Sequence, residues 1–149
     1  MEIIFKKAEI SDIKIILVMM SEFYTHEKLD YNQSVLQSAL EGLINNGSAG
    51  EVRVINYGSN IAGYFVLTFT YSLEYGGKNA LLDELYVREN FRGKGIGRQV
   101  LSFIEEFCRE KSIHAIHLQV KKFNPLAKRL YTAVGFEEVD RVFMTKVLF

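Results

Sequence analysis

Apolar side chains recur along this chain at two spacings, one typical of strands and the other typical of helices. Short β-branched and aromatic runs predict strands, and apolar residues at every third or fourth position predict amphipathic helices. These segments follow one another as a strand, two helices, three strands joined by tight turns, a helix, a strand, a helix and two closing strands. The mixture predicts a fold of the α/β (α+β) class.

The boundaries of these elements follow from particular residues. Ser11 and Asp12 begin a helix that ends near His26, and Asn124 with Pro125 begin a last helix that stops at a glycine. Strands are expected at residues 3–8, 51–56, 61–71, 79–87, 113–120, 136–139 and 142–148, and helices at residues 13–26, 32–45, 96–107 and 125–134. The strands at 79–87 and 113–120 flank a helix, so we expect them to be parallel.

Length, charge and cysteine content limit the possible classes of protein. A chain of 149 residues without a linker or repeat is expected to form a single domain over residues 1–149. Its 18 Lys and Arg balance 18 Asp and Glu, so charge gives no argument for nucleic acid or a membrane surface as a partner. Cys108 is the only cysteine, which excludes an internal disulfide, and the apolar run from Ile13 to Met20 is too short to span a membrane. We expect a cytoplasmic protein.

A glycine-rich stretch joins the predicted strand at 79–87 to the helix that follows. It contains Arg92, Gly93, Lys94, Gly95, Ile96, Gly97 and Arg98. Glycines let a ligand approach the backbone, while the helix N-terminus and three cations favour a phosphate or pyrophosphate. The spacing fits neither a P-loop, since Arg98 and Gln99 follow Gly97, nor a dinucleotide fingerprint, since Val100 replaces its third glycine.

The spacing Arg-x-x-Gly-x-Gly, placed directly after a strand, resembles the coenzyme A loop of the GNAT superfamily of N-acetyltransferases. A second segment resembles the late motif of the same family, with Asn124, Pro125, Ala127, Tyr131, Gly135 and Phe136 at the matching positions. Because the order of elements also fits, the resemblance extends along the whole chain. It implies a mixed central sheet splayed between its fourth and fifth strands, about four flanking helices, acetyl-CoA as cosubstrate and no metal.

The resemblance also implies which residues contact acetyl-CoA. Backbone N–H groups of the splayed strand would face the pantetheine and the thioester carbonyl, and those of the loop would hold the pyrophosphate. The implied positions are Leu85, Tyr86 and Val87 in the strand, Arg92, Gly93, Lys94, Gly95, Ile96, Gly97 and Arg98 in the loop, and Asn124, Lys128 and Tyr131 in the last helix. Asn124 is equally explained as a helix N-cap, and Lys128 as a solvated surface residue.

Attack of an amine on a thioester requires a base for the amine, a donor for the oxyanion and an acid for the thiolate. Tyr131 matches the family tyrosine that reaches the sulfur, although its position also suits a core residue with its hydroxyl at the rim. Asp83 matches the acid of small-amine members and is the expected base. Glu84 is one alternative, and proton loss to water, with the acid only holding the substrate's cation, is another. Adjacent strand residues point to opposite faces, and the β-bulge that the family has in this strand would change that relation.

We expect an acetyltransferase that acts on a small cationic amine. Leu81 stands where histone-type members carry the base, which disfavours a protein acceptor. Acidic and tyrosine side chains occur in segments that usually wall the acceptor site; these are Glu22, Tyr24, Glu27, Asp30, Tyr31, Tyr71, Glu74 and Tyr75. Solvated loop charges explain the acidic residues nearly as well. The alternatives are a peptide or protein acceptor, or a catalytically silent CoA-binding domain. A homodimer through residues 142–149 is an alternative to a monomer.

Overall fold

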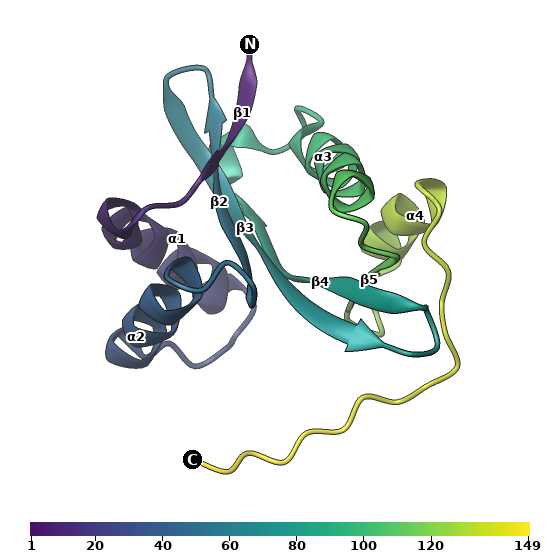
Figure 1. The fold of residues 1–149 in the computed structure, drawn as a ribbon. Coiled ribbons are helices and arrows are strands. Elements are labelled where there is room, and N and C mark those ends of the chain that lie inside the picture. Colours follow the sequence, from purple (N-terminus) through teal and green to yellow (C-terminus); the bar gives the residue numbers. More distant parts are fainter. The chain divides into compact units, whose positions relative to one another are not determined.

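A computed structural model covers all 149 residues and divides the chain into two compact units, Met1–Gln119 and Val120–Phe149. The first unit contains every strand and three of the α-helices (Figure 1). Its elements are β1 (Ile3–Lys7), α1 (Ile13–His26), α2 (Gln33–Ile44), β2 (Gly50–Tyr57), β3 (Asn60–Ser72), β4 (Gly77–Val87), α3 (Ile96–Glu110) and β5 (Ala115–Leu118), with short 3-10 turns at Ile10–Asp12 and Glu89–Phe91. The second unit contains α4 (Pro125–Ala133). None of the helices combines the length and apolar character needed to cross a bilayer.

The five strands form one mixed sheet in the order β1-β2-β3-β4-β5. The pairs β1–β2, β2–β3 and β3–β4 are antiparallel, whereas β4 and β5 are parallel because α3 carries the chain back between them. The parallel pairing runs only from Asn79 opposite Ala115 to Leu82 opposite Leu118. Beyond it, β4 continues to Val87 with β3 as its hydrogen-bonded neighbour. The predicted fold class, with its splay between the fourth and fifth strands, is confirmed.

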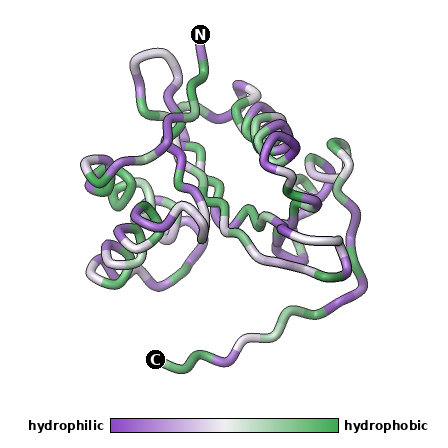
Figure 2. Tube along the Cα trace, viewed as in Figure 1, coloured by the Kyte–Doolittle hydropathy of each residue, from purple (hydrophilic) through white to green (hydrophobic).

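Helices cover both faces of the sheet in the first unit (Figure 1). Tyr64 and Val66 of β3 lie in an apolar core with Ile16 of α1 on one face. On the other face Phe65 contacts Phe103 of α3, with 6.1 Å between ring centroids. Alternate residues of β3 therefore pack against different helices, as the period-two pattern predicts. Figure 2 shows the hydrophobic and hydrophilic residues that alternate along α3, whose hydrophobic positions are the buried ones.

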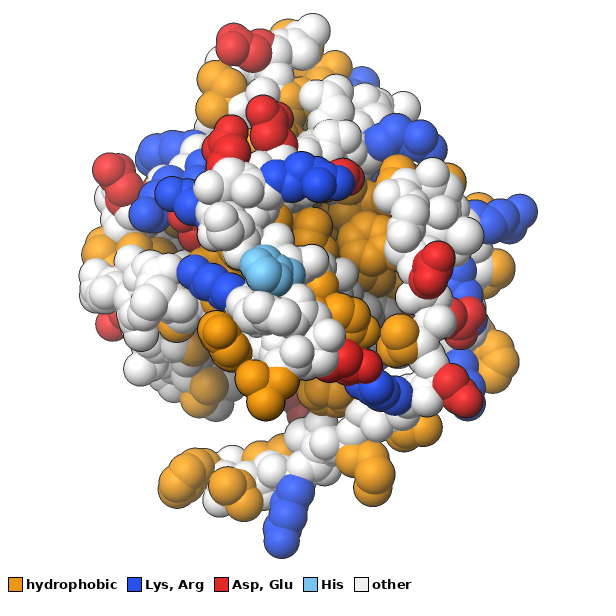
Figure 3. Space-filling view, turned by 45° about the vertical axis from the view of Figure 1, so that its right-hand side comes forward, with side chains coloured by type: hydrophobic (Ala, Val, Ile, Leu, Met, Phe, Trp, Pro, Cys, Tyr) orange, Lys and Arg blue, Asp and Glu red, His pale blue; other side chains and the backbone are white.

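The two closing strands expected at residues 136–139 and 142–148 are not formed. After α4 the chain has neither helix nor strand up to Phe149, and its large apolar side chains, such as Val142 and Phe143, are exposed. Figure 3 shows hydrophobic side chains along this terminal segment. Apolar, β-branched composition favours a strand only where a partner strand and packed neighbours are present. This segment has no hydrogen-bonded partner strand, so the prediction made from its composition is wrong.

Candidate active site

The two carboxylates of β4 lie at a β-bulge. Val66 of β3 pairs with Glu84, whereas the next residue, Leu67, pairs with Leu82. Asp83 is therefore the extra residue of the bulge, and the alternation of side chains is reset across it. As a result Glu84 shares a face with Val66 and looks toward α1, while Leu82 shares the opposite face with Leu67.

Two tyrosine hydroxyls hold the carboxylate of Glu84. Tyr24 of α1 donates to Oε2 at 2.6 Å, and Tyr64 of β3 donates to Oε1 at 2.7 Å. Tyr64 is fully buried, so its hydroxyl needs this partner. Burial raises the pKa of Glu84, while the two hydrogen bonds act in the opposite direction. Glu84 is thus a fixed acceptor that ties α1 and β3 to β4.

Asp83 has a different environment, although it is the adjacent residue. It is exposed on the bulge, yet partial burial of its carboxyl group raises its pKa. A carboxyl group that is reachable from solvent and holds its proton more strongly than usual is suited to exchange protons with a ligand. The bulge thereby gives two neighbouring acids separate surroundings.

Beyond the bulge, one edge of β4 has no partner strand. The N–H of Arg88 donates to the carbonyl of Ala62 in β3 at 2.8 Å. Because backbone groups alternate between the two edges of a strand, Tyr86 also directs its N–H and C=O toward β3, and Leu85 and Val87 direct theirs away from it. Since β5 ends before this point, Leu85 and Val87 present backbone groups along an unpaired edge.

Arg92 lies against this unpaired edge. Its Nε donates to the carbonyl of Val87 at 2.9 Å, and its guanidinium lies 5.8 Å from the centroid of the Tyr86 ring. Lys94 is placed similarly, with Nζ 5.8 Å from the centroid of the Tyr57 ring. Two of the cations expected around the glycine loop are therefore held over tyrosine rings, Arg92 over Tyr86 near the end of β4 and Lys94 over Tyr57 at the end of β2.

The three glycines of the loop differ in their backbone conformation. Gly93 and Gly95 have φ angles of +75° and +78°, which residues with a side chain rarely adopt. Gly97 lies in the first turn of α3 without such an angle, and a Cβ built on it meets no atom within 4 Å. The fold itself therefore does not require glycine at 97, and the open space there suits a ligand that lies against the backbone. Ile96 is only 2% exposed, so its side chain belongs to the core.

In the second unit, the residues of the late motif make local contacts. The side chain of Asn124 accepts a hydrogen bond at 3.1 Å from a backbone N–H of the first turn of α4, which confirms its expected role as an N-cap. Nζ of Lys128 lies 3.2 Å from a carboxylate oxygen of Glu138. The ring of Tyr131 packs edge-on against Phe136, and burial raises the pKa of its hydroxyl.

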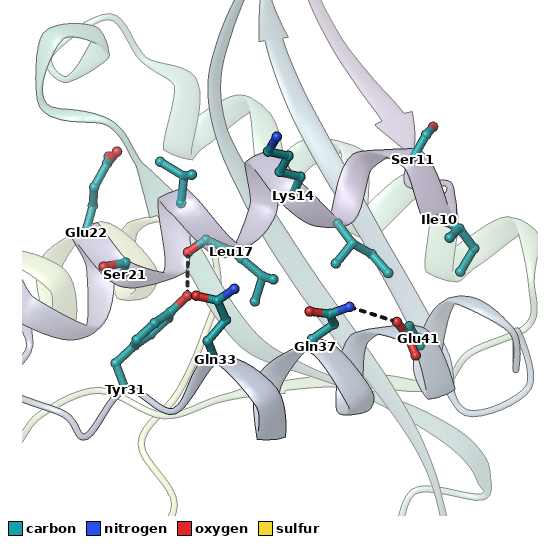
Figure 4. A pocket seen from close by; sticks show the side chains of 12 residues that line it. Ile10, Ser11, Lys14, Leu17, Ser21, Glu22, Tyr31, Gln33, Gln37 and Glu41 are labelled. Carbon is teal, nitrogen blue, oxygen red and sulfur yellow. Dashed lines mark hydrogen bonds between the residues drawn. The ribbon is translucent and has the colours of Figure 1, made fainter.

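Two hollows beside α1 have Glu22 in common. One runs between α1 and α2, where Tyr31 donates to the carbonyl of Leu17 at 3.3 Å and Gln37 donates to Glu41 at 3.2 Å (Figure 4). The other lies between the end of α1 and the end of β4, and its lining includes His26, Tyr86, Arg88, Glu89 and Arg92. Only the second hollow is lined by residues of β4 and of the segment that leads into the glycine loop.

Glu22 and Arg88 form an ion pair in this second hollow. Nε and Nη2 of Arg88 lie 3.2 and 2.8 Å from the two oxygens of Glu22, and the hydroxyl of Tyr86 donates to Glu22 at 3.0 Å. The side chains of Glu22 and Arg88 are 35% and 31% exposed. The pair is thus a second tie between α1 and β4, placed beyond the one that Glu84 makes.

Comparison with known proteins agrees with this geometry. A family model described as the acetyltransferase (GNAT) family matches residues 15–136, which include β4, the glycine loop and α4. The chain belongs to the GNAT family. The resemblance inferred from the two motifs is confirmed.

Relatives within the GNAT family include enzymes of known name. The chain is 28% identical to thialysine N-epsilon-acetyltransferase of Mus musculus over 147 residues, which cover 90% of this chain and 84% of that protein. It is 32% identical to the Bos taurus protein of the same name over 82 residues, 55% of this chain and only about half (48%) of that relative. The solved structure of an integron cassette protein from the mobile metagenome of Cole Harbour Salt Marsh has a TM-score of 0.85 and 29% identity, and covers 97% of this chain and 90% of that one.

The GNAT motifs do not reveal every residue that shapes this site. Glu22 and Tyr24 belong to the set expected to wall the acceptor site, whereas no motif marks Tyr64 or Arg88 for that role. Tyr64 is 20 residues from Glu84, and Arg88 is 66 residues from Glu22. Contacts between residues so far apart in the sequence leave no local pattern. The one available signal is an acidic residue within an apolar strand, because such a residue requires a buried partner.

Proposed function

We propose that this protein transfers the acetyl group of acetyl-CoA to the primary amine of a small cationic acceptor. The observation that carries the proposal is the unpaired edge of β4, which leads directly into the glycine loop at the N-terminus of α3. An extended ligand can pair with a free strand edge, and a phosphate can bind at a helix N-terminus. Acetyl-CoA combines both features, because its pantetheine arm joins an acyl thioester to a pyrophosphate.

The backbone provides the proposed coenzyme contacts. The outward N–H groups of Leu85 and Val87 would bind the thioester oxygen and the pantetheine, and those from Gly93 to Arg98 would bind the pyrophosphate. The open space above Gly97 supports close approach of the phosphates to the helix. Backbone donors fixed before the reaction can stabilise an oxyanion without reorganising as charge develops.

We assign the proton transfers to Asp83 and Tyr131. An alkyl ammonium has a pKa of about 10, so only a small fraction of it is free amine at neutral pH. Asp83 would take the proton of the amine as its nitrogen bonds to the thioester carbon. Tyr131 would then protonate the thiolate released when the carbon–sulfur bond breaks. Glu84 is the weaker candidate for the base, because both of its oxygens already accept hydroxyl hydrogen bonds.

The acceptor class is inferred from charge and from the relatives. The bulge places two carboxylates near the expected reaction centre, which favours a cationic amine over a neutral one. Two of the relatives, from Bos taurus and Mus musculus, bear the name thialysine N-epsilon-acetyltransferase. Thialysine is therefore the first acceptor to test.

The test measures thiol release from acetyl-CoA with thialysine, lysine, polyamines, aminoglycosides and peptides as acceptors. We expect release with small cationic amines, and thialysine among the best. Release with peptides alone would replace this acceptor class by a peptide or protein amine. Calorimetric binding of acetyl-CoA without release for any acceptor would indicate a silent CoA-binding domain, and the absence of binding would refute the proposal altogether.

A further inference from the structure

We propose that the hollow between the end of α1 and the end of β4 binds the α-amino acid head group of the acceptor. Arg88 would take its carboxylate and Glu22 its ammonium group. This inference rests on the proposed function, because it assumes that the distal amine of the acceptor reacts at the bulge.

The charges that line this hollow are balanced. Arg88 and Arg92 contribute two positive charges, and Glu22 and Glu89 contribute two negative ones. A polyamine would bring several positive charges into a hollow that already holds two guanidinium groups, and a free anion would meet two carboxylates. A ligand that carries one charge of each sign has a partner for both. The lining therefore favours a zwitterion.

The ion pair itself is oriented to accept such a ligand. Contacts with Glu22 use two of the five N–H donors of the Arg88 guanidinium, whose fork can hold a second carboxylate in the same plane. Both side chains are about one-third exposed, so a ligand in the hollow can reach them. Since Glu22 also accepts the Tyr86 hydroxyl, three side chains are fixed before binding, which lowers the entropy cost of recognition.

The hollow also lies at a suitable distance from the expected reaction centre at the bulge of β4. Tyr86, which contacts Glu22, is two residues beyond Glu84 on the same face of β4, a separation of about 7 Å along the strand. An extended lysine-type side chain covers a similar length between its α-carbon and its terminal nitrogen. If Glu22 and Arg88 hold the head group, the terminal amine would reach the position of the bulge at Asp83 along β4.

The same ion pair also fastens α1 to β4, so its loss can affect activity through the fold alone. The experiment therefore compares acceptors within one variant. Thialysine and its decarboxylated diamine differ only in the carboxylate. The diamine has two equivalent primary amines, and either of them matches the terminal amine of thialysine. Any distortion of the site in an Arg88 variant changes kcat/KM for both acceptors, whereas loss of a carboxylate contact changes it for thialysine only.

In Arg88→Gln we expect kcat/KM for thialysine to fall about tenfold to a hundredfold, the loss of one hydrogen-bonded charge contact, with little change for the diamine. Arg88→Lys keeps the charge without the fork and should give a smaller loss of the same selectivity. In Glu22→Gln we expect kcat/KM for the diamine to fall. For an analogue that keeps the carboxylate but lacks the α-amine, kcat/KM should not fall. Arg109→Gln is the matched control, because Arg109 also pairs with a carboxylate, that of Glu105 on α3, but lies outside the hollow.

Equal losses for thialysine and the diamine in both Arg88 variants would overturn the inference and leave Arg88 as a tie between α1 and β4. Preserved thiol release with the diamine would show, in that case, that the proposed function still holds. Failure of the unmodified protein to acetylate any amine would refute the proposed function instead.

Discussion

Replacement of Gly97 by alanine should affect the stability of the fold and the binding of acetyl-CoA in opposite directions. In a helix, glycine is less stable than alanine by about 0.5–1 kcal/mol, because it loses more backbone freedom on folding. Gly97 has no positive φ angle, and an added Cβ would touch no atom of the protein within 4 Å. Gly97→Ala should therefore stabilise the folded protein.

The expected gain is small but measurable. For a chain of 149 residues, 0.5–1 kcal/mol corresponds to a rise in Tm of about 1–4 °C. The added methyl group, however, would occupy the space in which the proposed pyrophosphate approaches the helix. We expect the Kd for acetyl-CoA to rise at least about tenfold, a loss of about 1.4 kcal/mol in binding free energy.

The assay pairs thermal unfolding with calorimetric titration of acetyl-CoA. Gly42→Ala is the matched control, because Gly42 also lies in a helix and its added Cβ also meets no atom within 4 Å. Gly42→Ala should raise Tm by a similar amount and leave acetyl-CoA binding unchanged. A Gly97→Ala protein that is stabilised and still binds acetyl-CoA with undiminished affinity would refute the assignment of this loop as the coenzyme site.

Three further changes test the chemistry. Tyr131→Phe should lower kcat by about a hundredfold to ten-thousandfold, with acetyl-CoA affinity nearly unchanged. Full turnover in this variant would show that Tyr131 is not the general acid. Burial raises the pKa of Asp83 above its ordinary value of 3.8, so the acidic limb of the pH profile of kcat/KM should lie above pH 3.8. This limb should disappear in Asp83→Asn. A change in KM alone would indicate that Asp83 binds the acceptor and does not act as its base. Burial also raises the pKa of Glu84 from its ordinary value of 4.5, so the folded state binds a proton there more strongly than the unfolded state does. The resulting contribution to stability is complete below that ordinary value and is lost as pH rises through the folded pKa. As pH rises above 4.5, the Tm of Glu84→Gln should therefore increase relative to the Tm of the unmodified protein. The exposed control Glu106→Gln should show no such trend.

Local sequence patterns were sufficient for most of the fold. Asn32 and Asn124 begin helices whose first turns they cap, and the glycines at 93 and 95 have the positive φ angles that a sharp strand-to-helix connection uses. These features depend on neighbours within a few residues. The closing strands were predicted wrongly, because a strand depends on a partner that composition alone does not reveal. That both units form one domain stays a prediction.

The candidate site could be predicted only where its chemistry lies in the backbone. The glycine loop and the strand before it were identified from their spacing, and the expected β-bulge is present at Asp83. The side chains that hold Glu84 and Glu22 come from elements far along the chain. Nothing near Tyr64 in the sequence marks it as the partner of a carboxylate, because its flanking residues are those of any buried strand.

One extra residue accounts for both unusual properties of β4. Pairing with β5 stops at Leu82, immediately before the bulge residue Asp83, whereas β3 continues to pair on the other side. A bulge increases the local twist of its strand, so the segment from Glu84 to Val87 turns away from the line that β5 would need to follow. The same insertion turns Glu84 to the face where Tyr24 can reach it. The free strand edge and the anchored carboxylate therefore both begin at the bulge.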